Sequence, residues 1–180
     1  MGMRAMLTTD QGHKYGEHLG ERHMEYAAWV REQAGSYSRN KESNPGRKKY
    51  YRKKKRYEEQ LHSYINQELN RFLQTEKPAI LYLPKLPGPN PSGVSKTINH
   101  SVTLWQRGYI RSRLYQKCRE QSIKIIEVRG KDISNLCSQC GEPGKKQDGT
   151  FFCSSCGVQA DERTNAACNA KKRWQEKDGS

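Results

Sequence analysis

The alternation of apolar and polar residues along the chain predicts a long amphipathic helix in its first half. From Pro45 to about Gln74, apolar side chains recur every three or four residues, which places them on one face of a helix. Because the opposite face is mostly charged, we expect this helix to pack on one side only. The earlier stretch HMEYAAWVREQA favours another helix, and GSYSRNKESNPG has the composition of a loop. The apolar face of the long helix comprises Tyr50, Tyr57, Leu61, Tyr64, Ile65, Leu69 and Phe72.

Three short segments have the pattern of β-strands. The first, AMLTTDQG, predicts a strand that ends in a glycine turn, with Asp10 at or just past its end. Residues 79–83 are a compact apolar run that predicts a buried parallel strand stopped by Pro84, and IKIIEVRG predicts another buried strand. The resulting order of strand, helix, strand, helix, strand predicts an α/β fold with right-handed crossovers. The helix between the last two strands would bury Val102, Trp105, Tyr109, Ile110 and Leu114.

Four of the six cysteines form two CxxC pairs, which predict a metal site. Their spacing is C-x2-C-x12-C-x2-C, and each CxxC turn can present two thiolates to one tetrahedral ion. The segment GEPGKKQDGTFF between the pairs carries glycines and a DG turn, as a two-stranded ribbon would. Four protein ligands leave no open position, so we expect structural zinc, with a rubredoxin-type iron centre as the alternative. The ligands would be Cys137, Cys140, Cys153 and Cys156.

The other two cysteines lie in helix-like stretches. We expect Cys118 and Cys168 to be small buried residues and not reactive thiols.

The charge of the chain indicates a polyanionic partner. It carries 33 Lys and Arg against 19 Asp and Glu, a net charge of +14, which favours nucleic acid. No apolar run is long enough to span a bilayer, and the N-terminus lacks the apolar region of a secretory signal, so we expect an intracellular protein. The long helix opens with a basic run predicted to contact the nucleic-acid backbone, comprising Arg47, Lys48, Lys49, Arg52, Lys53, Lys54, Lys55 and Arg56.

The order of elements and the residues from Trp105 to Trp174 resemble the C-terminal half of the transposon-encoded TnpB proteins and of the type V CRISPR effectors. The resemblance is carried by the strand IKIIEV, the segments CSQCG and FFCSSCG, and the helix opening TNAACNA. It implies a RuvC-like nuclease domain of RNase H fold interrupted by a zinc ribbon. The implied divisions are residues 1–133 for the N-terminal part of that domain, 134–158 for the ribbon and 159–180 for a C-terminal helix.

The resemblance also implies RNA-guided cutting of DNA by two divalent metal ions, held by an Asp, a Glu and an Asp. Asp10 corresponds to the first of these ligands, in its D-x-G context. Pro84 stands where the Glu is expected and Arg163 where the last Asp is expected. A proline cannot bind a metal ion, and a guanidinium repels one. The resemblance therefore implies a nuclease that has lost two of its three carboxylates.

Three other acidic residues are candidates to replace the missing ligands. Asp161 and Glu162 lie close to Arg163, although on a helix the side chain of Asp161 would be turned by roughly 200° from that position. If this segment is not helical, either carboxylate can still reach a magnesium ion. Glu127 is a more distant substitute for the missing Glu.

These observations lead to one main functional hypothesis and two alternatives. We expect a nuclease-inactive, nucleic-acid-binding module of an RNA-guided DNA-targeting system in the prokaryotic cytoplasm or nucleoid, with guide RNA and DNA as partners. The chain has no room for the recognition domains of such systems, so it would be a fragment, a reduced descendant, or one subunit whose partner supplies them. The alternatives are a magnesium-dependent endonuclease with rearranged carboxylates, and a subunit whose tyrosine-rich helix docks on another protein.

Overall fold

The computed structural model describes residues 5–37, 45–85 and 106–178, and the chain divides into two compact units. The first unit contains residues 16–75 and the beginning of the helix α4 (Arg107–Glu120), up to Leu114. The second contains Leu7–Tyr15, the segment around residues 76–88, and the chain from Tyr115 onward. No helix within the described ranges is long and apolar enough to cross a membrane.

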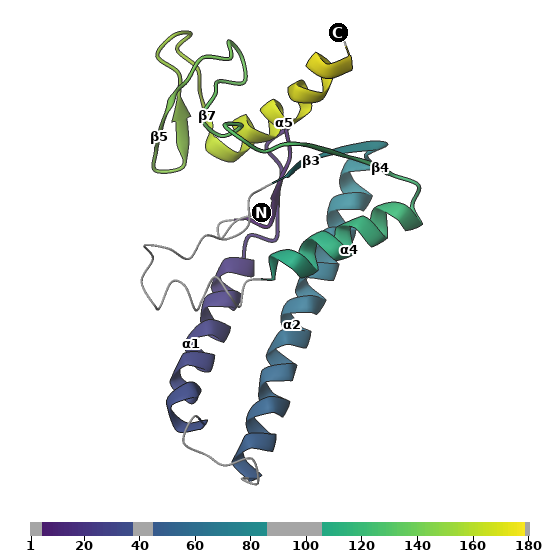
Figure 1. Ribbon diagram of the computed structural model, residues 1–180, viewed down its shortest axis with the longest axis vertical. Helices are drawn as coiled ribbons and strands as arrows, with labels where there is room; N and C mark the ends of the chain where they lie inside the picture. The colour runs from purple at the N-terminus through teal and green to yellow at the C-terminus, as the bar shows by residue number, and fades with distance from the viewer. Residues whose placement is uncertain (1–4, 38–44, 86–105, 179–180) are drawn as a thin grey trace. The chain divides into compact units, whose positions relative to one another are not determined.

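The first unit is built on two antiparallel helices, α1 (Leu19–Tyr37) and α2 (Pro45–Glu76), which lie side by side in Figure 1. The predicted long helix is confirmed and extends two residues beyond its expected end. Its apolar positions recur every four residues, so Leu61, Ile65 and Leu69 all lie in the core and are at most 2% exposed. The predicted loop GSYSRNKESNPG, residues 35–46, is wrong at both ends, because α1 continues to Tyr37 and α2 begins at Pro45; residues 38–44 lie outside the described residues.

The second unit contains a parallel pair of strands, β3 (Ile80–Lys85) and β4 (Lys124–Arg129), as the pattern predicted. The expectation that both are fully buried is wrong. Ile126 and Val128 pack on Ala170, whereas alternate residues of β4 are exposed and β3 is mostly half-buried. Pro84 does not stop β3, which continues to Lys85. Proline is tolerated there because β3 pairs on one side only within the described residues, so one row of its N–H groups has no ladder to complete.

Two further sheets complete the second unit. The predicted first strand, β1 (Leu7–Thr8), pairs with β2 (Lys14–Tyr15) in an antiparallel hairpin, not with β3. The predicted ribbon hairpin is confirmed as β5 (Lys145–Gln147) and β6 (Thr150–Phe152). Its turn has positive φ at Asp148 and Gly149, 50° and 85°, as a type I′ turn requires.

A third ribbon strand, β7 (Gln159–Asp161), pairs antiparallel with β6 and leads directly into the helix α5 (Glu162–Asp178). This strand begins just after residue 158, where the ribbon was expected to end. The domain boundaries expected from the sequence stay a prediction. The mixed α/β composition is confirmed. An RNase H-like sheet also stays a prediction, because the described strands form three small separate sheets.

Candidate metal centre and nucleic-acid interface

The two CxxCG segments fold into the same tight turn. In each, the glycine after the second cysteine has a positive φ, 80° for Gly141 and 74° for Gly157. The N–H of each glycine donates to the carbonyl of the first cysteine of its turn at 3.0 Å. A residue with a side chain is strained at this φ, so the glycines allow the chain to turn back around the sulfurs. The sequence therefore encodes two equivalent turns that present paired thiols.

The four sulfurs of these turns lie together. All are within 4.8 Å of one another, and the Sγ–Sγ distances are 3.6 Å for Cys137 and Cys156 and 3.5 Å for Cys140 and Cys153. A disulfide would need about 2.05 Å. A tetrahedral zinc ion with bonds of about 2.3 Å would place its sulfurs about 3.8 Å apart. The group therefore fits a zinc ion held by four thiolates, and among the described residues it is the one group of three or more His, Cys, Asp or Glu side chains close enough to hold a metal.

Backbone N–H groups favour the thiolate form of the two buried ligands. The N–H of Cys156 acts most strongly on Cys153 and lowers its pKa to about 6. At Cys137 burial opposes ionisation, but the N–H groups of Cys140 and Gln139 outweigh it and hold the pKa below its usual value. Because the thiolate is the form that binds metal, these donors prepare both buried cysteines as ligands.

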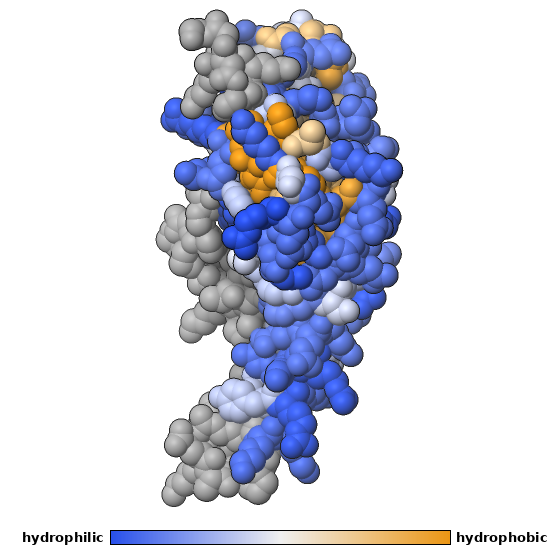
Figure 2. All heavy atoms as spheres, turned by 90° about the vertical axis from the view of Figure 1, so that its right-hand side faces the viewer, coloured by the Kyte–Doolittle hydropathy of each residue, from blue (hydrophilic) through white to orange (hydrophobic). Residues whose placement is uncertain are grey.

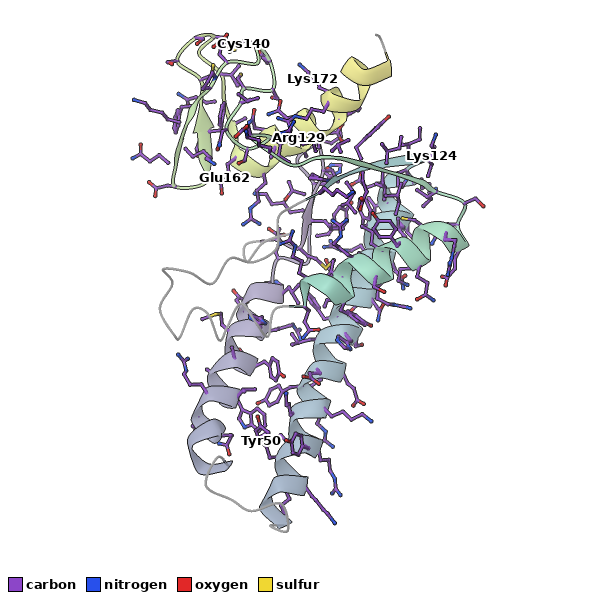
Figure 3. All side chains as sticks on the ribbon, viewed as in Figure 1. Tyr50, Lys124, Arg129, Cys140, Glu162 and Lys172 are labelled. Carbon is purple, nitrogen blue, oxygen red and sulfur yellow. The ribbon has the colours of Figure 1, made fainter. Side chains whose placement is uncertain are left out.

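A small apolar core supports the cysteine turns. Phe151 is fully buried and forms a cluster with Cys137, Cys153 and the partly buried Val158. A Cβ atom on Gly144 would lie 2.3 Å from the Phe151 ring, so only glycine leaves room for that ring. In Figure 3, Cys140 lies in the loops at one end of the β5–β6 hairpin, and Glu162 lies toward its other end, where the N–H of Glu162 donates to Gly149 at 2.9 Å.

Two asparagines of the TNAACNA segment bind the backbone of the first cysteine turn. Asn165 accepts a hydrogen bond from the N–H of Ser138 and donates one to the carbonyl of Leu136, both at 2.8 Å. Asn169 donates to the same Leu136 carbonyl at 2.7 Å and to that of Ile133 at 2.9 Å. The sequence predicted no structural contact for these two asparagines, which entered only as part of the TNAACNA resemblance. Their spacing of four within a helix was the available signal, because it places two amides on one face.

Asp10 lies two residues past β1, as predicted, in a turn closed by Gly12 at a φ of 86°. Its carboxylate forms an ion pair with Lys171 at 2.7 Å, and its backbone carbonyl accepts a hydrogen bond from Cys168 at 3.5 Å. The carboxylate is therefore already paired with a cation. Cys118 is fully buried as expected; Cys168 is half-buried, and burial raises the pKa of both thiols.

Asp161 is the last residue of β7 and caps the N-terminus of α5. One carboxylate oxygen accepts from the N–H groups of Arg163 at 3.0 Å and Thr164 at 3.1 Å, and the other accepts from Lys14 at 3.0 Å. Burial opposes ionisation, but Lys14 and the two N–H groups outweigh it and hold the pKa of Asp161 below its usual value. Because Asp161 is not helical, the expected rotation of its side chain relative to Arg163 does not apply. The oxygens are engaged in capping and in the ion pair.

The remaining candidate carboxylates are not brought together with these. Glu162 is the first residue of α5. Among the described residues, it does not belong to any group of three or more His, Cys, Asp or Glu side chains close enough to hold a metal ion. Glu127 pairs with Leu83 in the parallel register and with Lys85 in an ion pair, so it lies on the face of the sheet opposite Val128. Pro84 is aligned with Val128, on the face that packs against α5. Glu127 and Pro84 therefore lie on opposite faces of this pair of strands.

The basic run on α2 divides into residues with and without acidic partners. Lys54 and Lys55 form ion pairs with Glu58 and Glu59 at 3.9 and 3.8 Å, and Lys53 lies over the ring of Trp29. The side chain of Arg47 lies outside the described residues. Figure 2 shows mainly hydrophilic side chains where α2 runs. Apart from Lys53, the exposed residues of the run with no ion pair in the described part of the chain are Lys48, Lys49, Arg52 and Arg56.

Most of the tyrosine-rich face of α2 is used inside the first unit. Tyr50 stacks on Trp29, and the ring of Tyr57 packs against Trp29 at a tilt of 35°. The hydroxyl of Tyr64 accepts a hydrogen bond from the N–H of His18 at 3.2 Å. Tyr51 remains 53% exposed. This arrangement leaves little of the predicted tyrosine face for docking on another protein.

Residues 108–170 match the protein family described as "Cas12f1-like, TNB domain". The matched segment runs from α4 into α5 and includes all four cysteines and the two asparagines of α5 that bind the first cysteine turn. Comparison with curated proteins gives no match. The family match supports a TnpB- or Cas12f-type origin for this segment, which the sequence resemblance predicted.

Proposed function

We propose that the chain is a nucleic-acid-binding module of an RNA-guided DNA-targeting system of the TnpB or type V effector kind, with a structural zinc ribbon and no nuclease activity. The observation that carries the proposal is the match of residues 108–170 to a Cas12f1-like TNB domain, within which four sulfurs gather at zinc-binding distances. A zinc ion there would hold the fold of the ribbon, because four protein ligands leave no open position for chemistry.

The proposed loss of nuclease activity is supported by the surroundings of the candidate carboxylates. Asp10 and Asp161 are paired with Lys171 and Lys14, so an ammonium group balances each negative charge. Two magnesium ions would have to displace both lysines and would gain no ligand from Pro84. The alternative, an endonuclease that uses Asp10, Asp161 and Glu162, would require these side chains to converge on one site. Among the described residues, the one group of three or more His, Cys, Asp or Glu side chains close enough to hold a metal is the four cysteines.

The partners we propose are guide RNA and DNA, bound through phosphate contacts of the basic run on α2. Proteins of the Cas12f type act with guide RNA and target DNA, and charge contacts of this kind need no sequence readout by the protein. A second protein subunit would supply recognition domains, and the assembly would work in the prokaryotic cytoplasm or nucleoid.

The test is to express the chain with its native flanking DNA, purify it, and sequence the RNA that accompanies it. A discrete RNA species is expected, and recovery of bulk cellular RNA or of none contradicts the guided role. The same preparation is then incubated with plasmid and single-stranded DNA in Mg²⁺ or Mn²⁺, beside an Asp10→Ala variant. Equal, background-level cutting is expected for both. Cutting that Asp10→Ala abolishes contradicts the proposed inactivity and supports the endonuclease alternative.

A further inference from the structure

The first cysteine turn is held from outside the ribbon, by the side chains of α5. Leu136 and Ser138 are the two neighbours of Cys137 in the chain. The carbonyl of Leu136 and the N–H of Ser138 are both hydrogen-bonded to the side-chain amide of Asn165. The Leu136 carbonyl accepts two such bonds, at 2.8 Å from Asn165 and at 2.7 Å from Asn169. The peptide groups on both sides of Cys137 are therefore fixed by one helix.

The second cysteine turn is held differently. Phe152, which precedes Cys153, lies in the central strand of the ribbon sheet and is paired with Lys145 on one side and Gln159 on the other. In the first turn, Leu136 pairs with Pro143 in an isolated bridge, beside which the N–H of Cys137 donates to the carbonyl of Glu142 at 2.8 Å and that of Gly144 donates to the carbonyl of Asn135 at 2.9 Å. The strand pairing beside the first turn is thus shorter than the three-stranded sheet beside the second, and the contacts from α5 supplement it.

The two asparagines are buried in a helix, where this residue type is unfavourable unless its amide is hydrogen-bonded. Asn165 is 1% exposed and Asn169 is 8% exposed. Asparagine is a poor helix former, and a buried amide destabilises the fold unless it is hydrogen-bonded. Further along the same helix, Lys172 donates to the carbonyl of Ser138, and Arg173 donates to that of Arg129 at 2.7 Å. One side of α5 therefore carries a row of donors directed at the chain that leads into the first turn.

We propose that Asn165 and Asn169 are positioning residues of the zinc centre: they preset the backbone around Cys137 and thereby raise zinc affinity, and bound zinc in turn fixes α5. The coupling is reciprocal by thermodynamic necessity, since the clamped backbone belongs to both the metal site and the helix contact. Lys171, which pairs with Asp10, lies two residues beyond Asn169 on the same helix, so zinc would also fix the helix that holds this ion pair. The inference depends on the zinc centre of the proposed function and not on its nucleic-acid role.

The test measures zinc affinity of the full chain by competition with a chelator of known affinity. Removal of groups that orient metal ligands typically weakens binding about 10- to 100-fold, and Asn165→Ala is expected to fall in that range. Asn169→Ala is expected to have a smaller effect, because the Leu136 carbonyl keeps its bond from Asn165. The matched control is Asn135→Ala, in the same segment, whose side chain contacts Lys146 and neither peptide group beside Cys137. It should change zinc affinity less than about threefold, well below the range for oriented ligands.

Two further measurements separate positioning from general stabilisation. The absorption spectrum of the Co²⁺-loaded chain reports the geometry of the sulfur ligands, and Asn165→Ala is expected to alter it while Asn135→Ala leaves it unchanged. Amide exchange in α5 of the wild-type chain should accelerate when zinc is removed. If Asn165→Ala does not fold, zinc affinity and the Co²⁺ spectrum are compared between Asn169→Ala and Asn135→Ala instead.

Zinc affinity within twofold of wild type for a folded Asn165→Ala variant overturns the proposal, as does an equal loss in Asn135→Ala. Unchanged exchange in α5 on zinc removal overturns the reciprocal part. A wild-type chain that binds no zinc overturns the metal centre itself, whereas a chain that binds zinc but no RNA leaves this inference standing and removes only the guided role.

Discussion

The division of the basic run on α2 gives a sharp test of the nucleic-acid interface. Arg52 and Arg56 are exposed and form no ion pair within the described residues, whereas Lys54 and Lys55 each have a glutamate within 4 Å. Replacing either pair by glutamine removes two positive charges from the same two turns of helix. The two double variants therefore have equal net charge. They differ in whether the lost cations were already paired with a glutamate, and also in residue type, arginine against lysine.

The expected magnitude follows from counterion release. Each phosphate contact contributes about 0.9 to the slope of log affinity against log salt for duplex DNA and about 0.7 for single strands. Loss of Arg52 and Arg56 should therefore reduce the slope by about 1.4 to 1.8, that is, twice the contribution of one contact. Over a fourfold rise in salt, from 50 to 200 mM, that slope corresponds to a difference of about 7- to 12-fold in affinity. The Lys54 and Lys55 variant should keep nearly the wild-type slope.

The assay is fluorescence anisotropy with a labelled single-stranded RNA and a labelled duplex, each titrated at several salt concentrations. Zinc content is measured for every variant, so that loss of the ribbon is not mistaken for loss of the interface. Equal slopes for the two double variants would refute the reasoning, because the ion pairs would then have no bearing on phosphate contact. Unchanged binding by the Arg52 and Arg56 variant would move the interface away from α2.

Three further outcomes are expected. Cys137→Ser should release zinc and unfold the ribbon, since metal binding is folding free energy at such sites, and metal analysis with circular dichroism would contradict this by finding a stable zinc-free chain. Asp161→Ala removes a helix cap and should lower the free energy of unfolding by about 1 kcal/mol in denaturant titrations. Because the pKa of Asp161 is held below its usual value, this contribution should be present above pH about 4 and should be lost as the pH falls through the lower folded value. Pro84→Glu combined with Arg163→Asp should create Mn²⁺ binding measurable by calorimetry, and wild-type-like heats would show that the lysine pairs still exclude the ion.

The elements that the sequence predicts well depend on nearby residues. The apolar spacing of α2 is complete within the helix itself, so its start at Pro45 was correct and its end differs by two residues. The ribbon hairpin is specified by its DG turn, where Asp148 and Gly149 adopt the positive φ that a tight hairpin requires. Both elements are therefore determined by residues within the element itself and not by contacts with the rest of the chain.

The features that the sequence did not predict depend on residues far apart. Asp161 caps α5 and pairs with Lys14, which lies 147 positions earlier. Asp10 pairs with Lys171 across 161 positions. Neither pairing leaves a local pattern, and the half-burial of β3 depends on how many strands and helices cover it. The candidate carboxylates could be named from the sequence, but the cations that neutralise them could not.

The two metal sites that the resemblance implies depend on the fold in opposite ways. Four thiolates and the asparagines behind them hold the ribbon together, so losing a ligand costs folding free energy. Three carboxylates gathered without a metal ion would repel one another, so a chain without the ion gains stability when the cluster is dispersed. If Pro84 and Arg163 stand at the ligand positions that the resemblance implies, they disperse such a cluster, and Lys171 balances the charge of Asp10. A module that binds nucleic acid without cutting it can therefore lose the second site and must keep the first, which is the combination that the proposed function requires.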